Sequence, residues 1–189
     1  MPVPSLNHDT AERQTLDQIR DWHLGMVGAL VDQRASVFRA MRDNSTTAPR
    51  FATMTEAEVD AFYDAQRREL DRLTMLNLVA STEAEITIDY FRRVGKSLKD
   101  ELSRAYRKLH DSLSAAQQLR PPFDGAGILG VLKEANVMDN NIVGQYRECL
   151  AARHWVGHGR RWEKPIAVER FDPADVYDRC DKLLQSLPK

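Results

Sequence analysis

The chain has 189 residues, of which 42% are hydrophobic and 29% are charged, and its formal net charge is −1. This length allows one domain with a sizeable core plus an extension, and the composition is typical of a globular protein. The sequence has no apolar run near the roughly 20 residues of a membrane helix. It also lacks a signal-peptide pattern at its start, so we expect a cytoplasmic protein with no membrane partner.

Helical periodicity dominates the first half of the chain. Over residues 10–43, one face carries the side chains of Leu16, Ile19, His23, Met26, Leu30 and Val37, and the polar run 44–49 ends this predicted helix. Thr55 and Glu58 form a capping-box pattern that begins a second helix. Its apolar stripe consists of Val59, Phe62, Leu70, Leu73 and Leu76. A similar pattern, Thr82 with Glu85, leaves open whether the chain breaks, kinks or continues there.

The clearest helical pattern covers residues 88–116. Apolar side chains recur every three or four positions, at Ile88, Phe91, Val94, Leu98, Leu102, Ala105, Leu109, Leu113 and Ala116. This predicts one unbroken helix, which Pro121-Pro122 ends. Further helices are predicted over 126–136 and 142–156, separated by a loop at 139–141, and the second should end near Gly157. Residues 160–171 form a loop or include a short strand at 166–168, and Asp172-Pro173 begins a closing helix.

Charge is unevenly distributed along the chain. Residues 51–85 hold eight acids and three bases, a local net charge of −5. Residues 92–108 hold seven bases and two acids, a net of +5, and residues 147–170 hold six bases and three acids, a net of +3. These segments are either solvated helix faces or two basic surfaces that meet in space and attract a polyanion.

The segment 153–162, RHWVGHGRRW, concentrates chemistry-bearing side chains. It holds three arginines, two of the five histidines and two of the three tryptophans of the chain. Histidine titrates near neutral pH, and arginine presents a rigid fork of donors that matches phosphate. These residue types are what phosphodiester cleavage needs without a metal or another cofactor.

Each residue type in this segment suits one part of RNA cleavage. His158 is the candidate general acid or base, and Arg153 would hold the phosphate and stabilise charge in the transition state. His154 would orient a partner or supply a second titrating group, while Arg160 and Arg161 would bind flanking phosphates. Arg153 and His158 would lie roughly 140° apart on a regular helix. They converge more easily if the helix ends between them or if two copies face each other.

Two other interpretations stay open. His154 and His158 could form half of a zinc site, but the intervening residues lack the Glu of the HExxH pattern, and we predict no metal. Cys149 and Cys180 form no CxxC pair, and we expect them to be buried thiols. Alternatively, Arg153 and His158 are structural residues, hydrogen-bonded at a helix end. The tryptophans are expected to pack rather than to stack on bases.

The string AARHWVGHGRRW resembles the signature of the HEPN superfamily, which has Arg, four to six residues and then His. The upstream string STEAEITIDYFRRVGKSLKDELSR is similar to the opening helix of one bacterial branch, and the resemblance spans roughly residues 80–187. It implies an all-α antiparallel helical bundle over residues 79–189, with a helical N-terminal extension over residues 1–78. The motif Arg and His of the family correspond to Arg153 and His158, and its intervening polar residue corresponds to His154.

The resemblance also implies an activity and partners. Many members are metal-independent endoribonucleases of toxin–antitoxin or anti-phage systems, form homodimers and leave 2′,3′-cyclic phosphate ends. RNA, a second copy of the chain and an antitoxin or other regulatory protein are therefore the expected partners. Other members are non-catalytic modules that bind RNA, a nucleotide or a protein. Some relatives carry a Tyr that is adenylylated two residues after the motif His, and Arg160 occupies that position here.

Overall fold

The computed structural model describes residues 13–45, 48–96, 98–135, 137–160, 163 and 171–188. Its secondary structure consists of α1 (Leu16–Arg42), η1 (Pro49–Phe51), α2 (Glu56–Lys96), α3 (Glu101–Ser112), α4 (Ala115–Leu119), α5 (Ile128–Glu134), α6 (Asn140–Gly157) and α8 (Pro173–Gln185). No strand occurs in these described ranges, so the predicted all-α class is confirmed. The strand considered at 166–168 lies outside them.

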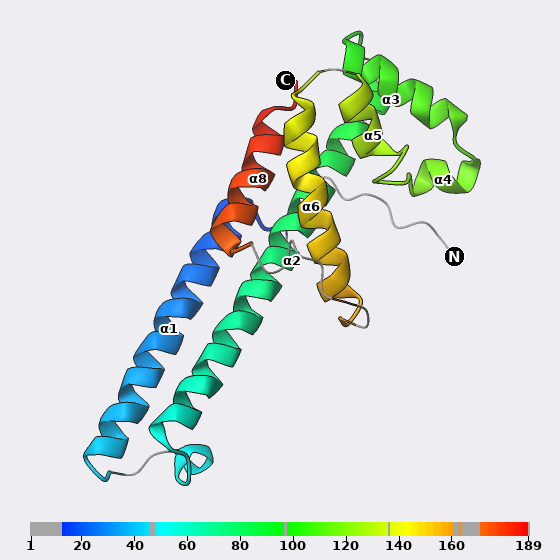
Figure 1. Cartoon of the computed structure of the whole chain (residues 1–189). Helices are drawn as coiled ribbons and strands as arrows, with labels where there is room; N and C mark the ends of the chain where they lie inside the picture. The colour runs from blue at the N-terminus through cyan, green and yellow to red at the C-terminus, as the bar shows by residue number, and fades with distance from the viewer. Residues whose placement is uncertain are drawn as a thin grey trace.

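Helices α1 and α2 form a long antiparallel arm that projects from the rest of the molecule (Figure 1). Helix α1 begins after a capping box, in which the backbone N–H of Gln18 donates to the Thr15 hydroxyl and the Gln18 side chain accepts from the Thr15 backbone N–H. The predicted face is buried at Leu16, Ile19, His23 and Val37, whereas Met26 is exposed. The arm therefore buries a narrower apolar stripe than the sequence pattern suggests.

Helix α2 is a single helix of 41 residues. It begins at the predicted capping box, where the Thr55 backbone N–H donates to Glu58 and the Glu58 backbone N–H donates back to the Thr55 hydroxyl. At Thr82 the helix continues, because the threonine hydroxyl donates to the Leu78 carbonyl oxygen one turn earlier instead of capping a new helix. The domain boundary predicted between the N-terminal extension and the helical bundle, at residues 78 and 79, falls inside this helix.

The unbroken helix predicted over residues 88–116 is wrong. Helix α2 ends at Lys96, α3 begins at Glu101, and a second interruption at Leu113 and Ser114 precedes α4. Asp100 caps α3 by accepting the Ser103 backbone N–H at 3.0 Å. A short break can leave the spacing of apolar residues nearly in phase, and periodicity alone therefore did not reveal it.

The last three described helices lie close to their predicted positions. Helix α5 falls inside the range 126–136, and α8 begins at Pro173 with Asp172 as its N-cap. The predicted loop at 139–141 is wrong beyond its first residue, since Asp139 is the N-cap of α6 and Asn140 and Asn141 are helical. Helix α6 ends at Gly157 as predicted.

The buried apolar residues form two principal clusters. The larger joins α2, α3, α5, α6, α8 and the start of α1. The smaller lies at the distal end of the arm, where Val37, Phe51, Val59 and Tyr63 pack together. No described helix is long and apolar enough to cross a membrane.

Candidate functional site

The described part of the candidate motif, residues 153–160, occupies about the last turn and a half of α6 and the residues directly after it. Gly159 has a φ of 75° and Arg160 a φ of 58°, so the chain turns away from the helix there. The Arg160 N–H donates to the Trp155 carbonyl at 3.0 Å, and the Gly159 N–H donates to the Val156 carbonyl at 3.2 Å. These two bonds form a Schellman motif, which explains why the helix ends where the glycines predicted.

The two motif histidines are brought together at this helix end. His154 and His158 are exposed, and their ring centroids lie 6.1 Å apart. His158 is the C-cap of α6, and its backbone N–H donates to the His154 carbonyl oxygen at 3.0 Å. Two imidazoles in this arrangement can reach one substrate group from solvent.

Arg153 contacts α2 through an ion pair. Its guanidinium lies 3.4 Å from the carboxylate of Glu83, and the two side chains are 31% and 29% exposed. Glu83 was not among the residues predicted from the sequence. The sequence holds only a weak signal for Glu83, because the orientation of α2 relative to α6 determines which acid of α2 reaches Arg153.

Arg160 is held by a second acid of α2. It forms an ion pair with Glu69, and its guanidinium also lies 5.8 Å from the centroid of the Trp155 ring. The hydrogen bond from Arg160 lowers the pKa of Glu69, and the charges of Arg160 and Arg72 act in the same direction. Trp155 is 6% exposed, so its expected packing role is confirmed. Arg161 and Trp162 lie outside the described residues.

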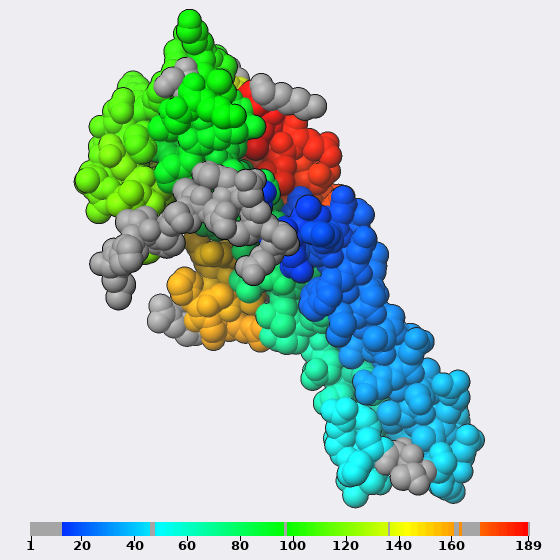
Figure 2. All heavy atoms as spheres, turned by 180° about the vertical axis from the view of Figure 1, so that it is seen from behind, coloured from blue at the N-terminus to red at the C-terminus, as the bar shows by residue number. Residues whose placement is uncertain are grey.

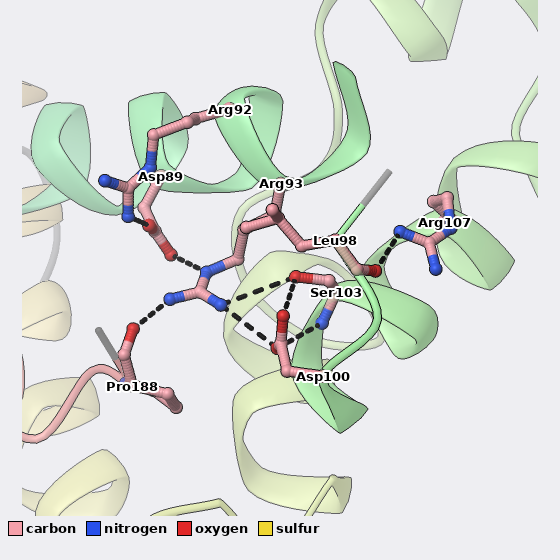
Figure 3. A network of polar contacts seen from close by, with 8 residues as sticks. All are labelled: Asp89, Arg92, Arg93, Leu98, Asp100, Ser103, Arg107 and Pro188. Carbon is pink, nitrogen blue, oxygen red and sulfur yellow. Dashed lines mark hydrogen bonds and ion pairs between the residues drawn. The ribbon is translucent and has the colours of Figure 1, made fainter. Parts of the chain in front are cut away.

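Asp89 and Arg93 build a polar network separate from the motif (Figure 3). Arg93 is 1% exposed, and its guanidinium contacts Asp89 at 2.6 Å, Asp100 at 3.1 Å and the carbonyl oxygen of Pro188. Ser103 completes the network by donating its hydroxyl to Asp100 at 2.6 Å. These groups join α2, the start of α3 and the end of the described chain, which is a structural role.

The zinc alternative gains no support from the described residues. No group of three or more His, Cys, Asp or Glu side chains among them is placed to hold a metal ion. His23 is buried and bonds Asp71 at 2.7 Å, and His110 bonds the Tyr90 hydroxyl at 2.9 Å. Both cysteines are free and buried, as expected, and burial raises the pKa of each thiol to about 12.

Among the described residues, the motif and the bases of 92–108 lie apart, while Arg161, Lys164 and Arg170 fall outside the described ranges. The motif lies at the C-terminal end of α6, whereas the bases of 92–108 surround α3, near the N-terminal end of α6 (Figure 1). The motif is instead flanked by acids of α2, so part of its positive charge is neutralised within the chain.

Comparison with known proteins adds no relative, because no family model, curated protein or solved structure matches this chain. The resemblance to HEPN proteins therefore stays a prediction that rests on the motif residues themselves.

Proposed function

We propose that this protein is a metal-independent endoribonuclease of the HEPN type that acts in a toxin–antitoxin or anti-phage defence system. The observation that carries the proposal is the pair of exposed histidine rings, His154 and His158, 6.1 Å apart and next to Arg153 at the end of α6. Acid–base cleavage of RNA needs two titrating groups within hydrogen-bond reach of the same phosphodiester, which is about 3 Å from each reacting oxygen.

The proposed reaction follows from these groups. One imidazole takes the proton of the 2′-hydroxyl, and the 2′-oxygen attacks phosphorus. The bond from phosphorus to the 5′-oxygen breaks, and the second imidazole protonates the leaving oxygen. Arg153 stabilises the charge that develops on the phosphate. The products are a 2′,3′-cyclic phosphate and a 5′-hydroxyl end.

A homodimer is part of this proposal. Arg153 and His158 differ in direction around the helix axis, and Arg153 is paired with Glu83 in the single chain. Two motifs facing each other would let Arg153 of one copy act beside His158 of the other. An antitoxin or other regulatory protein would then restrain the activity.

The test is cleavage of total RNA by the purified protein in EDTA, followed by analysis of the new ends. We expect wild type to leave 2′,3′-cyclic phosphates and both His158→Ala and Arg153→Ala to be inactive. Arg39→Ala, an exposed arginine on the arm, serves as the control and should keep wild-type activity. A His158→Ala protein that cuts at the wild-type rate contradicts the proposal.

A second candidate function is favoured by the ion pairs of Arg153 and Arg160 with acids of α2. Arginines already engaged in this way suit a non-catalytic module that binds RNA, a nucleotide or a protein. Salt-dependent RNA binding without product would identify such a module. If the motif were purely structural, Arg153→Ala would greatly lower the free energy of unfolding. The Arg153–Glu83 ion pair is about one third exposed, so on its own it should contribute at most about 1 kcal/mol.

A further inference from the structure

A basic surface surrounds α3, away from the motif. It consists of Lys96 at the end of α2, Lys99 in the following turn, and Arg104, Arg107 and Lys108 on α3. All are exposed except Arg107, which is half-buried and donates to the carbonyl oxygen of Leu98.

The charge of this surface is largely uncompensated. Within the described part of the chain, none of its five bases forms an ion pair with a carboxylate. Arg92, by contrast, is paired with Asp89, and Asp100 with the buried Arg93. The exposed acids of α3 are Glu101 and Asp111, so the five bases exceed them by three. Such an excess attracts a polyanion.

The apolar residues of α3 narrow the choice of partner. Leu102 and Tyr106 are 1% and 0% exposed, so the apolar face of this helix is used in the core and is not free to enter a membrane. The large apolar side chain exposed beside the bases is Leu98, at 39%. A protein interface is usually centred on several buried aromatic or aliphatic side chains, whereas contacts to a phosphate backbone need only the cations.

The basic surface around α3 and the motif are connected through α5 and α6. Helix α3 packs against α5 near the beginning of α6, and the motif lies at the other end of this helix of 18 residues. The surface and the motif therefore lie toward opposite ends of α6, whose length is about 27 Å at 1.5 Å per helical residue. Figure 2 shows α3 and the C-terminal part of α6 from the same side of the molecule.

We infer that the α3 surface is a second RNA contact, so that the substrate is an RNA long enough to reach from α3 to the motif. The length of α6 corresponds to about eight nucleotides at the roughly 3.4 Å spacing of one strand in a B-form duplex. The inference rests on the proposed function for its choice of RNA, and it adds a second binding surface and a minimum substrate length.

The test is RNA binding by the full chain in a His158→Ala background, which should keep the RNA intact. Fluorescence anisotropy would measure the affinity for a single-stranded RNA of about 20 nucleotides across a salt series. The variant is Arg104→Gln with Lys108→Gln, whose side chains are exposed. The matched control is Arg39→Gln with Arg42→Gln, which removes the same charge from the exposed end of α1.

We expect the α3 variant to bind about tenfold more weakly at low salt and its log–log salt slope to shrink by about 1.4, which is two lost phosphate contacts in a single strand. The control should stay within about twofold of the parent by the same reasoning. Equal behaviour of the two variants overturns the inference. So does an α3 variant that binds RNA normally but loses an oligomer seen for the parent, since the surface would then contact protein.

The two proposals fail separately. If the protein with His158 intact never cleaves RNA but the α3 variant loses affinity, the nuclease assignment is wrong and the α3 contact stands. If cleavage depends on His158 but RNA affinity does not change when Arg104 and Lys108 are replaced, the nuclease assignment stands and the α3 contact is wrong.

Discussion

Arg92 and Arg93 are neighbours that share one carboxylate, Asp89, yet their environments differ. The Arg92 side chain is 50% exposed, whereas that of Arg93 is 1% exposed. Burying a guanidinium is costly unless every donor finds a partner, and Arg93 finds Asp89, Asp100, Ser103 and the Pro188 carbonyl oxygen. Desolvation is the largest single influence on the pKa of Asp100 and raises it, but the hydrogen bonds from Ser103 and the charge of Arg93 together hold this pKa below its usual range.

We expect Arg93→Ala to destabilise the protein by about 3–5 kcal/mol, because it leaves Asp89 buried and without its main partner. Arg92→Ala is the matched control and should cost less than about 1 kcal/mol, since its ion pair is half exposed. Urea denaturation of both variants measures the difference. Similar losses for the two would show that the network in Figure 3 contributes little.

The described histidines and arginines of the motif, unlike Arg93, are exposed or partly exposed. His154 and His158 remain exposed at a helix end, while Arg153 and Arg160 are paired with Glu83 and Glu69. The sequence indicated these residues as candidates for the chemistry, because arginine and histidine are concentrated there. It did not predict the acids of α2, because contacts between residues 70 to 91 positions apart depend on how two helices cross.

At the scale of elements, α6 shows how glycine position determines a helix end. Gly144 lies inside the helix with an ordinary backbone, and a Cβ there would meet nothing within 4 Å. Gly159 follows the helix with a φ of 75°, a conformation that side chains with a Cβ rarely adopt. The same substitution should therefore have opposite effects at the two positions.

Gly144→Ala should stabilise the protein by about 0.5–1 kcal/mol, because alanine restricts the unfolded chain and favours the helix. Gly159→Ala should destabilise it by about 1 kcal/mol, because the left-handed backbone becomes strained. Thermal unfolding of the two variants provides the comparison. A Gly159→Ala protein as stable as Gly144→Ala would mean that the turn after α6 is not required for folding.

The junction between α2 and α3 shows the limit of periodicity. The apolar spacing over 88–116 is regular and predicts one helix. It gives no weight to Asp100, whose side chain caps a new helix and also accepts a hydrogen bond from Arg93. A cap residue inside a periodic stretch is a signal that the sequence contains. Whether it acts as a cap depends on the buried partner that holds it.

At the scale of the whole molecule, the two apolar clusters divide the structure into a body and the tip of the arm. The tip cluster is small and built from α1, η1 and α2 alone. Small cores support only low local stability, so the tip should open in local fluctuations that leave the body folded.

Val59→Ala and Val143→Ala form a matched pair, since both valines are 0% exposed and lie in different clusters. Each should cost about 2 kcal/mol locally. Hydrogen exchange should show lost protection confined to the distal arm for Val59→Ala and spread through α5, α6 and α8 for Val143→Ala. Equal loss of protection in α6 for both variants would contradict this division.

Sequence alone predicts the all-α class, the capping box at Thr55, the end of α6 and the concentration of Arg and His around that end. These features depend on local backbone preference and on residue types that are neighbours in the chain. Helix packing determines that α2 continues through Thr82, that Arg153 and Arg160 pair with acids of α2, and that the described motif residues lie away from the bases around α3. Those outcomes depend on helix orientation and burial, since a charge or a hydroxyl takes whichever partner the packed helices place beside it.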